Sequence, residues 1–234
     1  ERDDFLDLFE RLLIQLTQTV FPEKKIQQIP FPRIPYKEAM EKYGSDKPDL
    51  REDKNDKNVL AFCWIIDFPY FEKSDPAVSM KKSEWTFVHN PFSAPKPEFM
   101  DDLMQQKNTG GIVAHQYDIA MNGWELGSGG IRNNNPEAIM KVFETMGYDK
   151  AEIMEKFGHM IEAYTYGAPQ HGGIGFGLDR FVALLLNEPN IREVIAFPKT
   201  GDGRDLMMDA PSEIYPKQLE ELHISVKKPK IKKK

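Results

Sequence analysis

The spacing of apolar residues predicts several helices along the chain. Within Asp4–Phe21 the large apolar side chains recur every three to four residues, which predicts an amphipathic helix that Pro22 ends. The same spacing predicts helices over Pro136–Met146, which opens with an Asn-Pro start signal, and over Ala151–Tyr166. Tyr36–Tyr43 suits a shorter helix.

Shorter apolar runs predict strands. Val59–Phe68 (VLAFCWIIDF) is a β-rich run that ends at Pro69, and Glu84–His89 is expected to form a second strand beyond a mobile loop. Ile191–Pro198 is a further candidate strand, and the Pro-rich Ile26–Pro35 is expected to be extended.

An Asn-Gly pair at 122–123 lies within the segment 111–132 and predicts an antiparallel hairpin. With a two-residue turn there, Ala120 is opposite Glu125, and Asp118 lies two residues back on the same face. The hairpin therefore makes Asp118 and Glu125 diagonal neighbours on one face of a sheet.

Two further segments complete the pattern. The run HGGIGFGLDRFVALLL (171–186) combines four glycines with a strongly helical end, which predicts a strand, a tight turn and a buried helix from about Asp179. Residues 44–58 are polar, charged and without periodicity, as in an exposed loop or the place of an excised insertion. Because strands and helices alternate irregularly and no internal repeat is visible, the expected fold class is α+β.

Composition limits the classes of protein. The chain has 234 residues with fifteen Phe, eight Tyr and three Trp, enough for a core of one ordinary domain or two small ones, which excludes disorder throughout. No apolar run approaches the ~20 residues of a membrane span. A single cysteine, Cys63, and no signal sequence near the start predict a reducing, cytoplasmic compartment.

Charge argues against a protein that coats nucleic acid. The formal net charge is −6, although residues 227–234 (KKPKIKKK) hold six lysines that form either a solvated tail or a contact for a polyanion. Because the sequence opens Glu-Arg-Asp-Asp without Met, we expect it to be part of something longer.

Asp118 and Glu125 are the first candidate chemical group. Two adjacent carboxylates repel each other unless a cation or a proton lies between them. Mg²⁺ suits such a pair, because it takes oxygen ligands and bridges carboxylates to substrate phosphates. The alternative is a pair of solvated acids.

Three basic side chains are further candidates. Arg180 lies near the start of a helix after Gly-rich backbone, where a bound phosphate would offset the unfavourable helix dipole; otherwise it pairs with Asp179 or another acid. Arg132 joins the two carboxylates if a bulge at Gly129 or Gly130 resets the strand alternation, and is otherwise a surface residue. His89 could bind an anion or be an ordinary strand-end histidine.

The ensemble resembles bacterial-type aspartyl-tRNA synthetase, a class II aminoacyl-tRNA synthetase. The blocks that carry the resemblance stand in family order and are YGSDKPDLR (43–51), VHNPFSAPK (88–96), YDIAMNGWELGSGGIR (117–132), FGHMIEAYTYGAPQHGGIGFGLDR (157–180) and IREVIAFPKT (191–200). The GLDR segment is similar to class II motif 3. The family fold, an antiparallel sheet flanked by helices, agrees with the α+β expectation.

The resemblance implies a role for each candidate residue. Arg180 would hold the ATP γ-phosphate beside a nucleotide-binding turn formed by Gly177, Leu178 and Asp179. Glu125 and Asp118 would coordinate Mg²⁺, Arg132 would pair with the aspartate side-chain carboxylate, and His89 would lie on a mobile loop over the amino acid. The implied reaction forms aspartyl-adenylate from aspartate and ATP and then charges the 3′ end of tRNA.

The chain departs from the family pattern in several ways. The anticodon-binding barrel, the dimerisation motif 1 and motif 2 are absent from it, so residues 1–226 are expected to be a partial catalytic domain that is inactive alone. Residues 44–58 stand where bacterial members carry an insertion domain. The family often has a second His after the one at position 89, where this chain has Asn90.

Two other functions compete with an aspartate-tRNA ligase. A truncated paralogue could serve as a binding or regulatory protein. A related ligase could activate asparagine, although a positive charge at Arg132 suits a carboxylate better than an amide.

Overall fold

The computed structural model of the chain describes residues 1–74 and 83–227. Its α-helices are α1 (Arg2–Val20), α2 (Tyr36–Tyr43), α3 (Met100–Met104), α4 (Pro136–Thr145), α5 (Lys150–Thr165), α6 (Leu178–Leu185) and α7 (Pro216–Glu221). Its strands are β1 (Lys25–Ile26), β2 (Arg33–Pro35), β3 (Val59–Leu60), β4 (Phe62–Ile66), β5 (Phe71–Lys73), β6 (Trp85–Phe87), β7 (Gln116–Met121), β8 (Trp124–Ile131) and β9 (Gly172–Phe176). Short 3-10 turns lie at Pro97–Phe99, Thr109–Gly111 and Ile191–Glu193.

The predicted helices α1, α2, α4 and α5 are confirmed, with ends that differ from the expected ones by at most two residues. Two predictions lie partly outside the described residues: the loop before β6, of which 75–82 are not described, and the Lys-rich tail, of which 228–234 are not described. The described residues before 75 include β5, a strand that the sequence pattern does not predict.

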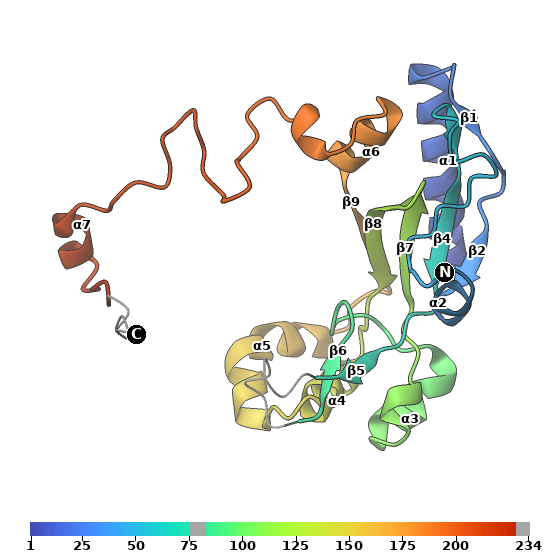
Figure 1. The fold of residues 1–234 in the computed structure, drawn as a ribbon. Coiled ribbons are helices and arrows are strands. Elements are labelled where there is room, and N and C mark those ends of the chain that lie inside the picture. Colours follow the sequence, from blue (N-terminus) through green and yellow to red (C-terminus); the bar gives the residue numbers. More distant parts are fainter. Residues whose placement is uncertain (75–82, 228–234) are drawn as a thin grey trace, which may run out of the picture.

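The largest sheet has five strands in the order β2, β4, β7, β8, β9. β2 runs parallel to β4, and the other neighbours are antiparallel, which gives the mixed, mostly antiparallel α+β architecture expected from the sequence. Figure 1 shows this sheet beside α1, with α3, α4 and α5 below it. Small two-stranded sheets pair β1 with β3 and β5 with β6.

The turn between β7 and β8 explains why the predicted strand 59–68 is split. Asn122 and Gly123 both have positive φ, as the predicted two-residue turn requires. The Asn122 side-chain oxygen accepts a hydrogen bond from the Ala61 amide at 2.8 Å, and its amide group donates to the Val59 carbonyl at 2.9 Å. The side chain thus interrupts the run between β3 and β4.

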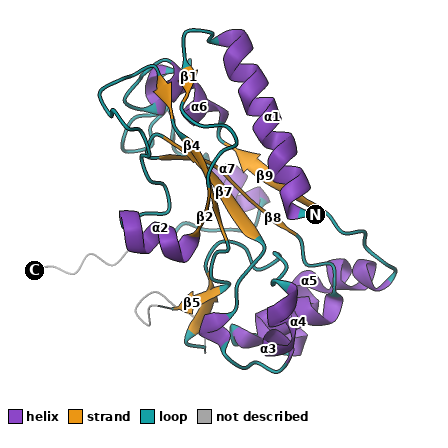
Figure 2. Cartoon of the chain, turned by 90° about the vertical axis from the view of Figure 1, so that its right-hand side faces the viewer, coloured by secondary structure: helices purple, strands orange, loops and turns teal. Residues whose placement is uncertain are grey.

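Apolar clusters pack on both faces of the sheet. On one face, α1 and α6 pack against alternate residues of β4, β7 and β8, among them Trp64 and Tyr117, which are fully buried. Figure 2 shows α1 running along the sheet. On α1, the residues Leu6, Glu10, Leu13 and Thr17 are buried, whereas Leu8 and Leu12 are exposed.

The opposite face of the sheet is covered only in part. A smaller cluster, which includes Cys63, Ile65 and Ala120, packs against α2. Further along the same strands the surface carries polar residues and glycines. A third cluster, built by α3, α4 and α5 with β5, forms a helical layer next to that uncovered surface. The site lies where these clusters leave the sheet open.

β8 contains one residue more than β7 opposite it. Ala120 pairs with Glu125 as predicted, but Ile119 pairs with Gly127, so Leu126 has no partner in β7. The bulge therefore lies at Leu126, and the predicted alternative of a bulge at Gly129 or Gly130 is wrong. Leu126 is fully buried, because the extra residue turns into the core below α6.

The segment after α6 departs from the prediction of a strand at Ile191–Pro198, which is wrong. Residues Ile191–Glu193 form a 3-10 turn, because the side chain of Asn190 accepts a hydrogen bond from the Arg192 amide at 2.9 Å. Beyond it the chain leaves the sheet and carries α7 away from the body (Figure 1). None of the helices in the described part is both long and apolar enough to cross a bilayer.

Gly129 and Gly173 provide a matched test of close packing between β8 and β9. A Cβ on Gly129 would lie 2.2 Å from the Gly173 carbonyl oxygen and 2.7 Å from the Tyr117 ring, whereas a Cβ on Gly173 would meet nothing within 4 Å. We expect Gly129→Ala to lower the free energy of unfolding by about 2 kcal/mol or more and Gly173→Ala to change it by less than about 1 kcal/mol. Urea unfolding of both variants measures the difference, and equal effects would contradict the described strand spacing.

Candidate functional site

The cleft on the open face of the sheet has a volume of about 470 Å³, within the range of small-molecule sites. Glycines of β8 and β9 form much of its floor, and His89, Ser128, Arg132 and His171 line it. The lack of side chains at the glycines leaves room for a ligand against the backbone. The structure thus brings two of the predicted site residues, His89 and Arg132, into one cleft.

Arg132 reaches this cleft because of the bulge. Ser128 lies opposite Asp118 and Gly130 opposite Gln116, so even-numbered residues after the bulge share the face of Asp118. Backbone contacts then hold the end of the strand, since the Arg132 amide donates to the His171 carbonyl at 2.8 Å. Among the described residues no carboxylate forms an ion pair with Arg132. Its guanidinium is available to an anionic ligand.

Asp118 is the most perturbed acid near the cleft. It is 2 % exposed, and burial raises its pKa to about 7, with Glu125 adding to the rise and the nearby Ser128 hydroxyl opposing it. Its Oδ1 atom is buried and has no hydrogen-bond partner among the described residues. A buried acid with an unsatisfied oxygen is costly unless a proton or a cation joins it.

His89 lines the cleft and lies near Asp118. Its Nε2 is 3.9 Å from Asp118 Oδ2, and its ring packs edge-on against Phe68 with 4.6 Å between ring centroids. Burial lowers the pKa of His89, although Glu125 and other acids oppose this. A neutral imidazole near pH 7 can donate or accept a hydrogen bond to a ligand.

Glu125 and Arg180 form a second cluster further along β8. Arg180 Nη1 donates to the Glu125 carbonyl oxygen at 2.8 Å and lies 3.6 Å from Glu125 Oε1, so its acidic partner is Glu125 and not Asp179. The Arg180 side chain is 48 % exposed, which leaves part of the guanidinium open to solvent.

The start of α6 is fixed by the same bulge. The Gly177 amide donates to the Leu126 carbonyl at 2.6 Å, and Leu178 and Asp179 follow as exposed residues in the first turn of α6. Gly177, Leu178, Asp179 and Arg180 therefore stand together at the edge of the sheet. They do not line the cleft that contains Arg132.

Two charged residues that act on the site carry no signal in the sequence pattern. Asp46 raises the pKa of Asp118 and Lys47 lowers it, so both lie near this carboxylate. They belong to the 44–58 segment, which has no helix or strand but is held in place: Gln27 donates to the Leu50 carbonyl at 2.9 Å and accepts from the Glu52 amide at 3.0 Å. A charged, aperiodic segment gives no sequence signal of where it will lie.

The acidic residues can supply part of a metal site but not all of it. No group of three or more His, Cys, Asp or Glu in the described ranges could enclose a metal ion. The unsatisfied Oδ1 of Asp118, with Glu125 close enough to raise its pKa, fits an ion that takes one or two protein carboxylates and completes its shell with phosphates and water. The arrangement suits a ligand that brings its own phosphate oxygens.

The family comparison agrees with the motifs. The family described as tRNA synthetases class II (D, K and N) matches residues 1–201. Among curated proteins, the "Aspartate--tRNA(Asp/Asn) ligase" of Chlorobium chlorochromatii is 51% identical over 179 residues, which are 76% of this chain and 28% of that protein. The protein of the same name from Chlorobium phaeobacteroides strain BS1 is 45% identical over 233 residues, 99% of this chain and 36% of that protein.

The chain therefore spans about a third of the length of these curated relatives. Among solved structures, "Aspartyl tRNA synthetase from Entamoeba histolytica" is similar with a TM-score of 0.59 at 23% identity, covering 88% of this chain and 42% of that one. That likeness supports the class of fold described above.

The buried Asp118 generates a prediction about stability and pH. Because its pKa in the folded protein is above the ordinary 3.8, the folded state holds this proton more tightly, and stability falls as pH rises from about 4 to about 7. Without divalent cations, Asp118→Asn should raise the free energy of unfolding by about 2 kcal/mol at pH 5 and about 4 kcal/mol at pH 8.

Urea unfolding in EDTA at both pH values measures this effect. Glu155→Gln, on the exposed face of α5, is the control and should show no comparable pH dependence. An Asp118→Asn effect that is the same at pH 5 and pH 8 would contradict the described burial of the carboxylate.

Proposed function

The chain belongs to the class II tRNA synthetases of the D, K and N type, and on that premise we propose that it is part of the catalytic domain of an aspartate–tRNA ligase. The protein that contains it activates aspartate with ATP to aspartyl-adenylate and transfers the aspartyl group to the 3′ end of tRNA. The names of the relatives at 45% to 51% identity support this substrate.

The observation that carries the proposal is the unpaired guanidinium of Arg132 in the cleft. No described carboxylate neutralises it, while its planar donors suit a carboxylate that binds with both oxygens. Aspartate supplies such a group, whereas asparagine would place a neutral amide against a full positive charge. His89 lines the same cleft and contacts the same amino acid in this proposal.

ATP is assigned to the neighbouring cluster. Arg180 is half exposed at the first turn of α6 and binds the γ-phosphate, while Gly177, Leu178 and Asp179 form the adjoining turn. The guanidinium already contacts Glu125, so phosphate binding there involves both residues. The amino acid and the nucleotide thus bind next to each other along β8.

Asp118 and Glu125 are the residues that would hold Mg²⁺ in this site. When bound, the ion would neutralise charge on the phosphates of ATP. The unsatisfied oxygen of Asp118 supports this assignment.

In the proposed reaction an α-carboxylate oxygen of aspartate attacks the α-phosphorus of ATP. A new carboxylate–phosphorus bond forms, and the bond to the β-phosphate oxygen breaks to release pyrophosphate. A 3′-terminal hydroxyl of tRNA then attacks the aspartyl carbonyl carbon, and AMP leaves. Arg132 and Arg180 hold the two ends of the reacting pair, so alignment and charge neutralisation provide the catalysis without a protein nucleophile.

The proposal also includes the cellular setting and partners. The substrates are aspartate, ATP and tRNA, and the reaction would take place in the cytoplasm, with the family homodimer as the expected assembly. Experiments on activity use the full-length gene product that contains this chain.

Arg132→Leu in that gene product is the direct test of the amino-acid site. We expect kcat/KM for aspartate in ATP–pyrophosphate exchange to fall on the order of 100-fold or more, because the variant leaves a carboxylate without its partner, while the KM for ATP changes little. Arg11→Leu, on the exposed face of α1, is the control for loss of an arginine. Unchanged aspartate-dependent exchange would refute the role of Arg132.

Arg180→Ala tests the nucleotide site, where we expect the ATP dependence of the reaction to change more than the aspartate dependence. We expect the KM for ATP to rise by about tenfold or more, because a phosphate contact is lost, with a smaller change in the KM for aspartate. The same exchange assay, with ATP varied at saturating aspartate, measures it. If Arg180→Ala instead altered only the aspartate dependence, the assignment of the two clusters would be wrong.

A further inference from the structure

Asp67 has an unusual backbone conformation at the end of β4. Its φ is 60°, in the left-handed region that non-glycine residues seldom adopt, although Asp and Asn tolerate it best. β4 ends one residue before it, and the chain turns there toward Phe68. Such a conformation persists where the surroundings hold it in place.

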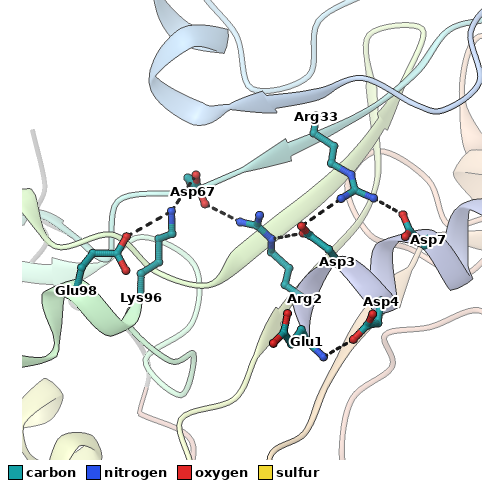
Figure 3. A network of polar contacts seen from close by, with 9 residues as sticks. All are labelled: Glu1, Arg2, Asp3, Asp4, Asp7, Arg33, Asp67, Lys96 and Glu98. Carbon is teal, nitrogen blue, oxygen red and sulfur yellow. Dashed lines mark hydrogen bonds and ion pairs between the residues drawn. The ribbon is translucent and has the colours of Figure 1, made fainter.

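Cations from two other segments hold the Asp67 carboxylate. Arg2 Nη1, at the start of α1, lies 2.7 Å from Asp67 Oδ1, and Lys96 Nζ lies 3.2 Å from Asp67 Oδ2. Figure 3 shows Asp67 between these side chains, with Glu98 beyond Lys96. Because all three groups are mostly shielded, with exposures of 17% to 24%, these pairs are less weakened by solvent than surface pairs.

Phe68, which follows Asp67, connects this network to the cleft. Its side chain is fully buried, and its ring meets the His89 ring edge-on at 4.6 Å. Its carbonyl accepts a hydrogen bond from the Ala114 amide at 2.9 Å, just before β7. The turn at Asp67 therefore sets where the Phe68 ring stands, and Phe68 supports one side of His89.

Lys96 fixes the other end of the His89 segment. The segment from His89 to Lys96 follows β6, and at its end the Lys96 amide donates to the Val113 carbonyl at 2.9 Å. Asp67 and Phe68 thus contact the two ends of the same segment: the Phe68 ring packs against His89, and the Asp67 carboxylate pairs with Lys96.

We propose that Asp67 is a positioning residue for His89: the Arg2–Asp67–Lys96 contacts fix the turn that presses Phe68 against the His89 ring at the wall of the cleft. This inference rests on the proposed function, in which His89 contacts the amino acid. Asp67 lies outside the cleft and touches no substrate in this account. It affects the reaction only through the position of the Phe68 ring, which packs against His89.

Substitutions at Asp67 separate the backbone from the charge. Asp67→Ala removes the carboxylate and disfavours the left-handed turn, whereas Asp67→Asn keeps a residue that accepts this turn. In aspartate-dependent ATP–pyrophosphate exchange by the full-length gene product, Asp67→Ala should raise the KM for aspartate by about tenfold and leave the KM for ATP within about twofold. Asp67→Asn should restore part of the loss.

Glu98→Gln is the matched control. Glu98 belongs to the same network, where among the described residues its one ion pair is with Lys96, and its side chain is 58 % exposed. Its variant should keep both KM values. A role in stability alone would lower the active fraction and hence the apparent kcat, without a selective change in the KM for aspartate. Unchanged aspartate KM in Asp67→Ala, with active wild type, would overturn the proposal.

A second measurement keeps the inference separate from the proposed function. NMR of protein with ¹³C-labelled histidine reports the ring signals of His89, which are assigned by their loss in His89→Gln. Because the ring current of Phe68 acts on these signals, they should shift in Asp67→Ala and stay near the wild-type position in Glu98→Gln. If wild type shows no aspartate-dependent exchange, the proposed function fails while this shift still tests the positioning. His89 signals unchanged in Asp67→Ala overturn the positioning whatever the activity.

Discussion

The extra residue at Leu126 determines how the site is assembled. By resetting the alternation of β8, it places Ser128 and Arg132 on the face that also carries Asp118 and Glu125. Without it, the odd spacing from Glu125 to Arg132 would send these two side chains to opposite faces. The same bulge presents adjacent carbonyls to α6, where the Glu125 oxygen accepts from Arg180 and the Leu126 oxygen from Gly177. One irregularity of a strand thus fixes both clusters of the site.

The surroundings of Asp118, His89 and Arg132 affect the charge of each side chain differently. Asp118 is buried, and burial raises its pKa to about 7, while burial lowers the pKa of the neighbouring His89, so in both residues burial opposes the charged form. Arg132 remains charged and has no described acidic partner. In the proposed function the substrates supply what is missing: a carboxylate for Arg132, and a phosphate-bound cation for the unsatisfied oxygen of Asp118.

Local patterns in the sequence predict much of the fold. The Asn-Gly turn, the helix start at Asn135-Pro136 and the glycine-rich strand before α6 each carry their own signal, and the structure has all of them. The strand expected at Ile191–Pro198 fails because the side chain of Asn190 stabilises a turn, which an apolar pattern does not reveal. β5 and α3 are too short to give a periodic signal.

The site is less predictable, because it depends on register and on loops. The sequence predicts the hairpin and the helix start that carry the candidate residues, but the position of the bulge follows from the burial of Leu126 below α6, a tertiary contact. Asp46 and Lys47 act on Asp118 from a segment whose charged, aperiodic composition hides its contacts.

The most direct measurement is a crystal structure of the full-length gene product with a non-hydrolysable aspartyl-adenylate analogue. The account predicts the analogue's side-chain carboxylate within hydrogen-bond distance of the Arg132 guanidinium, its amino-acid part beside His89, and Leu126 turned into the core. A carboxylate bound elsewhere in the cleft, with Arg132 facing solvent or the nucleotide base, would contradict it.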